Sequence, residues 1–203
     1  MRSHRTTRTA TVTAGPRTSS KQGGHDDDSK QRRGSDRETG LGPAAIADSH
    51  LARPGPYRCG ARSMPGIDYL KAMIAGELPP PPMAMLMQFE LVDVEPGEVV
   101  FTCEPDASMY NPNGAIHGGL VCTVLDSVAG LALHSTLPAG KGYTSIEIKV
   151  NYLKPLRLDA GPLTATGTVV KSGARVGFTE GVVTDASGKV VATATSTLLV
   201  FDL

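Results

Sequence analysis

Hydrophobic and polar positions follow two kinds of repeat along the chain, and together they divide residues 64–203 into predicted elements. Apolar side chains recur at intervals of three and four over 117–137, with no proline between them, which predicts one long helix. The same spacing over 66–76 predicts a short helix that ends in a glycine and is stopped by the proline run at 79–82.

Alternation of apolar and polar positions predicts strands on both sides of the long helix. Before the helix, two apolar stretches separated by EPG predict a hairpin, and after it the turns LDAG, SG and ASGK contain turn-forming residues. The predicted strands cover residues 89–94, 98–104, 143–153, 162–172, 174–185 and 189–201. This order predicts an α+β fold in which an antiparallel sheet wraps around one helix, and about 140 residues suffice for such a core.

The first sixty residues show neither the helical nor the strand periodicity, and they contain few residues that could fill a core. They carry eleven Lys and Arg against six Asp and Glu, a net charge of +5. This composition predicts a disordered basic tail over 1–63, followed by a domain over 64–203. The tail is then either a segment that the domain does not need or an extension upstream of a start at Met64.

The charge and cysteine content of the whole chain argue against several classes of protein. Twenty Lys and Arg balance twenty Asp and Glu, so the molecule has no electrostatic reason to bind nucleic acid or an anionic membrane. Three cysteines without a C-x-x-C spacing argue against a disulfide framework and a structural zinc site. The sequence contains no run of 18 consecutive apolar residues, so it predicts no membrane span. We therefore expect a protein of the reducing cytoplasm.

The stretch NPNGAIHGGLVCTVLDSVAG, residues 111–130, combines polar residues with the start of the predicted helix. A helix that begins near Gly118 directs unpaired N–H groups, with about half a positive charge, towards whatever precedes it, which suits an oxyanion. Gly118 and the glycine after it leave room for a carbonyl group, and Asn111 and His117 lie just upstream. Asp126 lies in an apolar run, where a carboxylate is costly unless it is paired, hydrated or used in catalysis.

Each of these residues also has a structural interpretation, and the spacing alone does not decide between the two. Paired glycines permit tight packing, a histidine often caps a helix, and an aspartate in a helix is usually exposed. Cys122 shares a helical face with Asp126, but no base is placed to activate it, so we interpret it as a small buried hydrophobic residue. We interpret His134, in the last helical turn, as a cation favoured by the helix dipole.

Helix geometry constrains how Gly118 and Asp126 could cooperate. They are eight residues apart, so their backbones lie about 12 Å from each other along one helix. An amide and a carboxylate must both come within about 3 Å of the reacting group, so one helix cannot supply both. If this stretch forms an active site, we expect two chains to share it.

The motif NPNGAIHGG with an aspartate nine residues after the histidine, followed by TSIEIKVNYLKP and ATATSTLLV, resembles the hotdog-fold acyl-CoA thioesterases. The similarity is to their phenylacetic-acid-degradation (PaaI-like) branch, and it covers 64–203. The resemblance implies a long central helix wrapped by an antiparallel sheet. It also implies homodimers, often dimers of dimers, with active sites at the dimer interface.

The resemblance also implies roles for individual residues. Asp126 matches the catalytic carboxylate, acting as general base or nucleophile, and Gly118 matches the residue whose N–H polarises the thioester carbonyl. Asn111 matches the asparagine that orients water or substrate, and His117 the histidine of the H-G-G turn. Ser145 resembles a hydroxyl residue that lines the aspartate side of the site.

The remaining expectations concern the substrate. Thr144 is the alternative to its neighbour Ser145 for lining the site, and Lys154 and Arg175 are weak candidates for contacts with CoA. We expect no metal and no cofactor beyond the CoA of the substrate, and the sequence does not name the acyl group. The motifs G-x-S-x-G and H-E-x-x-H are missing from the sequence, and 138–145 does not form a phosphate loop.

Hydrolysis of acyl-CoA thioesters to free acid and CoA is the function that these residues favour. A thioester carbonyl has weak resonance stabilisation, so a polarising amide and a nearby carboxylate suffice. Two alternatives stay open: a hotdog module that binds acyl-CoA without turnover, and a hotdog enoyl-CoA hydratase.

Overall fold

A computed structural model describes residues 62–203, and every element below lies in that range. The predicted disordered tail over 1–63 therefore falls, but for two residues, outside the described residues. The helices are α3 (Gly66–Ile74), α4 (Pro82–Leu86) and α5 (Gly118–His134), with short 3-10 turns η2 (Ala107–Met109) and η3 (Leu158–Ala160). The strands are β1 (Phe89–Glu95), β2 (Glu98–Cys103), β3 (Lys141–Tyr152), β4 (Leu163–Ser172), β5 (Val176–Thr184) and β6 (Val190–Asp202).

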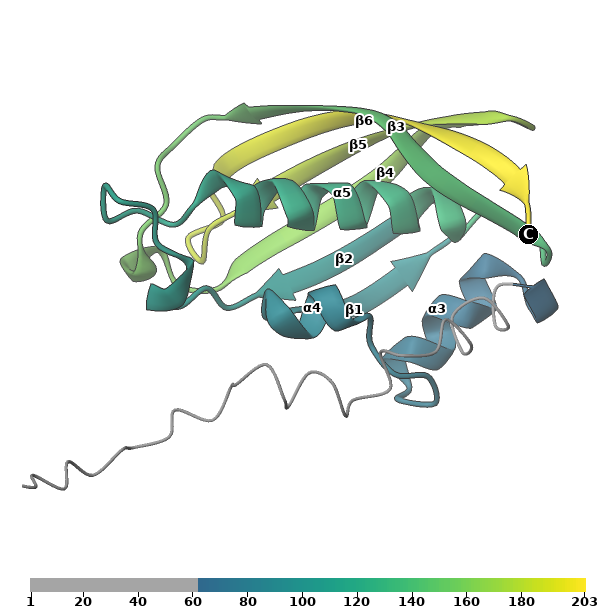
Figure 1. Ribbon diagram of the computed structural model, residues 1–203, viewed down its shortest axis with the longest axis horizontal. Helices are drawn as coiled ribbons and strands as arrows, with labels where there is room; N and C mark the ends of the chain where they lie inside the picture. Colours follow the sequence, from purple (N-terminus) through teal and green to yellow (C-terminus); the bar gives the residue numbers. More distant parts are fainter. Residues whose placement is uncertain (1–61) are drawn as a thin grey trace, which may run out of the picture. The chain divides into compact units, whose positions relative to one another are not determined.

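The strands form one antiparallel sheet in the order β1-β2-β4-β5-β6-β3, so β1 and β3 are its two edges. The sheet curves around α5 (Figure 1). Strands β3, β6, β5 and β4 lie on one side of the helix, and β2 and β1 extend the sheet around it. This arrangement confirms the predicted α+β hotdog fold. It also confirms the six predicted strands and the long helix, which begins and ends within a few residues of the predicted bounds.

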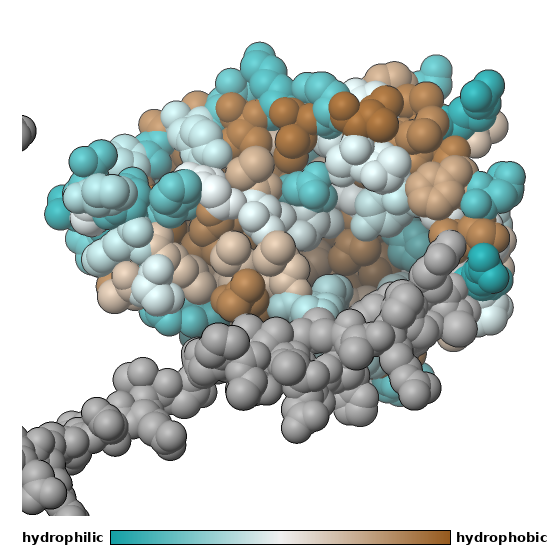
Figure 2. Space-filling model, viewed as in Figure 1, coloured by the Kyte–Doolittle hydropathy of each residue, from teal (hydrophilic) through white to brown (hydrophobic). Residues whose placement is uncertain are grey.

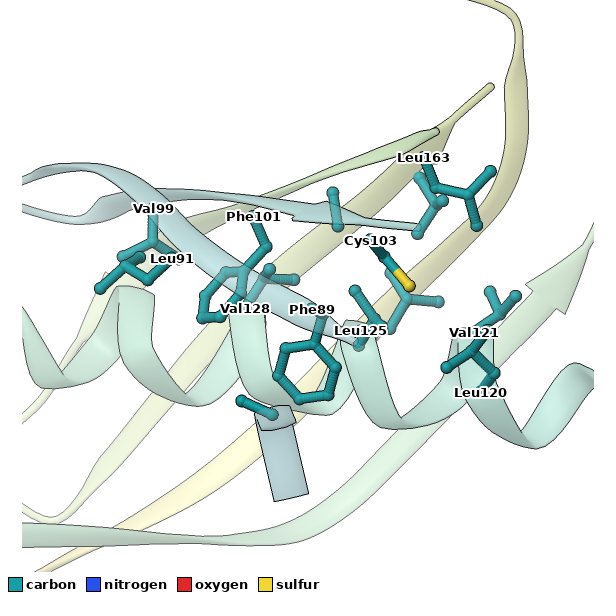
Figure 3. Close-up of a cluster of buried hydrophobic side chains, with 14 of the residues drawn as sticks. Phe89, Leu91, Val99, Phe101, Cys103, Leu120, Val121, Leu125, Val128 and Leu163 are labelled. Carbon is teal, nitrogen blue, oxygen red and sulfur yellow. The ribbon is translucent and has the colours of Figure 1, made fainter. Parts of the chain in front are cut away.

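The core lies between α5 and the inner face of the sheet. Leu125 and Val128 of the helix are completely buried, and Figure 3 shows them among the inward side chains of β1 and β2, including Phe89 and Phe101. The helix approaches the sheet closely, because an added Cβ at Gly167 of β4 would lie 2.5 Å from the carbonyl carbon of Val128 and closer still to its oxygen. The apolar face of α5 is therefore fixed against the sheet, and this packing positions its remaining face.

The segment before β1 differs from the prediction that the proline run only ends a helix. Helix α3 ends at Ile74, and Gly76 follows with φ +75°, a conformation that glycine adopts easily at a helix end. The last proline of the run, Pro82, then begins α4, which the sequence analysis did not predict. Proline is tolerated at the first position of a helix because the N–H it lacks would have no partner there.

The interpretation of His134 as a helix-end cation is wrong. The side chain is 5% exposed and packs edge-on against the ring of Tyr69, with the ring of Tyr143 on another side. Desolvation lowers the pKa of His134 to about 4, so the imidazole is neutral at pH 7. Burial outweighs the helix dipole here, because the dipole contributes only about 0.3–1 kcal/mol at an exposed site.

Candidate active site

Helix α5 begins at Gly118, and His117 is its N-cap. The Nδ1 atom of His117 accepts a hydrogen bond of 2.8 Å from the backbone N–H of Gly119, which satisfies one of the unpaired donors of the first turn. The N–H of Gly118 has no acceptor within the described part of the chain. This N–H is therefore available to an external acceptor, as the prediction requires, and His117 itself acts as a cap.

The two glycines at the helix start are in close contact with neighbouring side chains. A Cβ at Gly119 would lie 2.9 Å from Nδ1 of His117, and one at Gly118 would lie 3.2 Å from the ring of Tyr152. The Tyr152 hydroxyl donates a 3.0 Å hydrogen bond to the carbonyl oxygen of Gly118. The absence of a Cβ at Gly119 thus leaves room for the His117 ring, whereas a Cβ at Gly118 would require the Tyr152 ring to shift by only a few tenths of an ångström. The predicted access of a substrate carbonyl stays a prediction.

Asn111 organises the loop that leads into α5. Its Oδ1 atom accepts hydrogen bonds from the backbone N–H groups of Asn113 at 2.9 Å and Ala115 at 3.2 Å. Asn111 and Gly118 both line a recess of about 330 Å³ at this end of the helix. Because Oδ1 is already engaged, only the Nδ2 amide group of Asn111 is left to hydrogen-bond a molecule in the recess, and it can only donate.

Asp126 lies two turns further along α5 with its side chain exposed. Its Oδ1 atom accepts a 2.7 Å hydrogen bond from the hydroxyl of Ser145 on β3, and these two predicted residues are thus brought together. Thr144, the alternative, is exposed and has no side-chain hydrogen bond within residues 62–203. Adjacent residues of a strand point to opposite faces, so only one of the two can reach Asp126.

The structure separates the two halves of the predicted site. Because α5 is continuous from Gly118 to His134, the eight-residue spacing between Gly118 and Asp126 corresponds to about 12 Å along the axis. Asn111, His117 and Gly118 therefore gather at the start of α5, whereas Asp126 and Ser145 meet near its middle. Within one chain these groups cannot act on the same atom.

The side of α5 that carries Asp126 is open in the single chain. Gly119 and Asp126 are exposed, and Cys122 and Thr123 between them are half-buried, so the interpretation of Cys122 as a buried residue is wrong. Buried Cys103 fits that description instead, and desolvation raises the pKa of its thiol to about 11. The open side of the helix is where another molecule could come close to the carboxylate.

The edge strand β3 lies along the same open side. It pairs with β6 on one side only, so its outer backbone groups have no strand partner in the described chain. The register of the β3–β6 pair shifts between Ser145 and Glu147, and the intervening Ile146 is 59% exposed. An exposed apolar residue on an unpaired edge is a typical site of strand pairing between chains.

A larger cleft, of about 750 Å³, opens beside the second half of α5, where Ser127, Leu131 and Tyr143 line it. Figure 2 shows apolar and polar residues interspersed on one face of the domain. Sequence reasoning missed Tyr143, because alternation placed it on a strand without showing what it contacts. The hydroxyphenyl ring packs so closely on Gly130 that a Cβ there would lie 2.5 Å from it.

The candidate CoA contacts differ from each other. Lys154 forms an ion pair with the buried carboxylate of Asp185, with 2.7 Å between Nζ and Oδ2, and this contact holds the pKa of Asp185 well below its usual range. Its ammonium group thus has a structural partner, although it lies at the recess beside Gly118. Arg175 is exposed and forms no ion pair within residues 62–203.

An antiparallel sheet wrapped around a long central helix defines a hotdog-fold protein, and the available helix-start amide and the exposed carboxylate make up its candidate site. The sequence profile of the Thioesterase superfamily matches residues 113–192. Human acyl-coenzyme A thioesterase 13 is 30% identical over 109 residues, which cover 53% of this chain and 76% of that protein. The chain therefore belongs to the thioesterase superfamily, which confirms the predicted family and enzyme class.

Solved structures show the same fold. A phenylacetic acid degradation-related protein from Ralstonia eutropha JMP134 superimposes with a TM-score of 0.60 at 26% identity, covering 64% of this chain and 98% of the other. A Streptococcus mutans UA159 protein bound to acetyl CoA superimposes with a TM-score of 0.52 at 32% identity, covering 56% and 89%. Within residues 62–203, no helix is both long and apolar enough to cross a membrane.

Proposed function

We propose that this protein hydrolyses acyl-CoA thioesters to free acids and CoA, at sites that two copies of the chain share. The name of the human relative and the acetyl CoA in the Streptococcus mutans structure support CoA thioesters as the substrate. The observation that carries the proposal is geometric. A free helix-start amide at Gly118 and an exposed carboxylate at Asp126 are both present, but about 12 Å apart on one helix.

The proposed chemistry uses these two groups from different chains. The thioester carbonyl oxygen accepts a hydrogen bond from the N–H of Gly118, which stabilises the negative charge that develops on that oxygen. Asp126 of the other chain takes a proton from water as its oxygen attacks the carbonyl carbon. The C–S bond then breaks, the CoA thiolate leaves with the proton, and the acid remains. Alternatively, the carboxylate attacks the carbonyl carbon directly, and the C–S bond breaks with release of the CoA thiolate. Water then hydrolyses the resulting mixed anhydride to the free acid and the regenerated carboxylate, and the proton that water gives up goes to the thiolate.

The neighbouring residues support these steps. Ser145 donates to one oxygen of Asp126 and so leaves the other oxygen free to meet water or substrate. Asn111 offers its Nδ2 donor beside Gly118, where it can hold the thioester or the attacking water. His117 holds the helix start in place through its hydrogen bond from Gly119. No step in this scheme passes through a metal or a cofactor.

Assembly of two copies supplies the missing half of each site. We propose that the copies pair through the free edge of β3, as a homodimer or a dimer of dimers, because this edge runs beside the open side of α5 that carries Asp126. The free thiols of Cys103 and Cys122 are in keeping with a reducing compartment such as the cytoplasm.

Complementation between two inactive variants tests the shared site. Asp126→Asn removes the carboxylate, and Gly118→Pro removes the N–H at a position where proline suits a helix, with Gly118→Ala as the control that keeps the N–H. Asp126→Asn and Gly118→Pro should each lose thiol release from an acyl-CoA panel, whereas the control Gly118→Ala should retain it. Refolded together in equal amounts, they should regain about a quarter of wild-type activity, because half the dimers are mixed and each has one intact site.

Other outcomes would contradict the proposal in separate ways. No recovery in verified mixed dimers would place the whole site in one chain. Wild-type activity in Asp126→Asn would rule out the carboxylate mechanism. Saturable acyl-CoA binding without turnover of any chain length would favour a binding module, and hydration of an enoyl-CoA would favour a hydratase.

A further inference from the structure

The cleft beside the second half of α5 has mainly apolar walls. One wall is the segment from α3 to α4, and the other is formed by β1, α5 and the start of β3. Its apolar lining includes Met73, Leu78, Met83, Phe89, Leu131 and Tyr143. Its volume of about 750 Å³ falls within the range of roughly 300–1,000 Å³ that small-molecule sites occupy. Methionine side chains are flexible, so this lining can adapt to ligands of irregular shape.

The cleft lies beside the carboxylate half of the proposed active site. Ser127, the residue after Asp126, lines the cleft, and so does Tyr143, two residues before Ser145 on β3. The ring of Tyr143 lies on Gly130, one turn after Asp126, and burial together with the nearby Asp126 charge raises the pKa of Tyr143, so this side chain is close to both the carboxylate and the cleft. A group attached to a carbonyl carbon beside Asp126 would therefore reach the cleft by passing along Tyr143.

We propose that this cleft receives the acyl group of the thioester and selects uncharged, apolar acyl groups that are longer than acetyl. The inference rests on the proposed thioesterase function and adds the substrate class. Each methylene group buried in such a site increases kcat/KM by about fourfold, provided that the contact is also made in the transition state.

The charges around the cleft account for the proposed selection of uncharged acyl groups. Glu90 and Glu104 line it, whereas no lysine, arginine or histidine does so within residues 62–203. A carboxylate at the far end of an acyl group would meet like charge and no cationic partner, and it would lose hydration on entry. The cleft therefore discriminates between hexanoyl and adipoyl groups, which differ by a terminal carboxylate.

Initial rates with acetyl-CoA, hexanoyl-CoA and adipoyl-CoA test the proposal. The wild-type protein should hydrolyse hexanoyl-CoA with a kcat/KM at least about tenfold above those of the other two thioesters. Ser127→Leu, which fills the cleft from α5, and Met73→Trp, which fills it from α3, should each remove most of this preference while acetyl-CoA turnover stays within about twofold. Lys71→Trp, on the exposed side of α3 and outside the cleft lining, is the control for added bulk.

A charge variant tests the selection against carboxylates. Glu90→Gln should raise kcat/KM for adipoyl-CoA several-fold, and Glu180→Gln on β5, which does not line the cleft, should not. Preference of the wild type for acetyl-CoA, or equal losses on acetyl and hexanoyl thioesters in both filling variants, would overturn the cleft as the acyl site. Absence of turnover with every thioester in the wild type would instead overturn the proposed function itself.

Discussion

Replacement of Gly167 by alanine should destabilise the fold, because the glycine lies directly beneath α5. An added Cβ would lie 2.5 Å from the carbonyl carbon of Val128, whereas real Cβ atoms essentially never approach closer than 3.0 Å. Strand β4 or helix α5 must therefore move by at least about 0.5 Å, the difference between these two distances. Because the clash is with backbone, no rotamer change can relieve it.

The neighbouring glycine on β5 provides a matched control. Gly181 is paired with Gly167 across the two strands, but a Cβ there would lie 2.9 Å from the end of the Leu125 side chain, which can rotate. Overpacking typically costs about 1–3 kcal/mol, and the loss of glycine entropy in the unfolded chain offsets about 0.4–1 kcal/mol. We expect a net loss of about 2 kcal/mol for Gly167→Ala and less than about 1 kcal/mol for Gly181→Ala.

Urea unfolding followed by far-UV circular dichroism measures both values, since the chain contains no tryptophan. The variants and the wild type must be compared at one protomer concentration, because any assembly adds to the stability. An unchanged urea midpoint for Gly167→Ala, or a larger loss for Gly181→Ala, would refute the close approach of α5 to the sheet. Since α5 carries Gly118 and Asp126, the same displacement should also reduce thioesterase activity.

Three further predictions follow from individual side chains. Ser145→Ala should lower kcat about tenfold, equivalent to ~1.4 kcal/mol for one hydrogen bond to the Asp126 carboxylate, whereas Thr144→Ala should leave it nearly unchanged in the same thiol-release assay. Because the pKa of His134 falls to about 4 on folding, the unfolded chain takes up a proton between about pH 6.5 and pH 4 that the folded chain does not. Stability should therefore fall by up to about 3 kcal/mol as the pH decreases through this range, and His134→Gln should flatten that dependence in urea titrations. Burial and a pKa of about 11 should protect Cys103 from iodoacetamide at pH 8 until urea unfolds the protein, as peptide mass spectrometry would show.

Much of the fold could be predicted because the relevant signals are local. Alternation along each strand is fixed by its own residues, and it located both β1 and β6 to within one or two residues at each end. The structure of the segment around Pro82 was harder to predict, because a proline can either end a helix or begin one. Only the surrounding tertiary structure decides which of the two occurs.

The candidate site was predictable only in part. The motif indicated Asp126 and Gly118, and helix geometry alone indicated that one chain must separate them. The preference for Ser145 over Thr144 at the carboxylate required the orientation of β3 against α5. The pairing of Lys154 with Asp185, 31 residues away, likewise had no signal in the sequence around either residue.

The sequence by itself determined the order of helices and strands, the family motif and the spacing of the two candidate catalytic groups. These depend on interactions within a few residues, or on residue types at fixed positions. Only the tertiary structure decided that His134 is buried and neutral, that Tyr143 lines a cleft beside α5, and that β3 is an edge strand of the sheet. Such features depend on which distant segments pack together and exclude water, and that is a property of the whole folded chain.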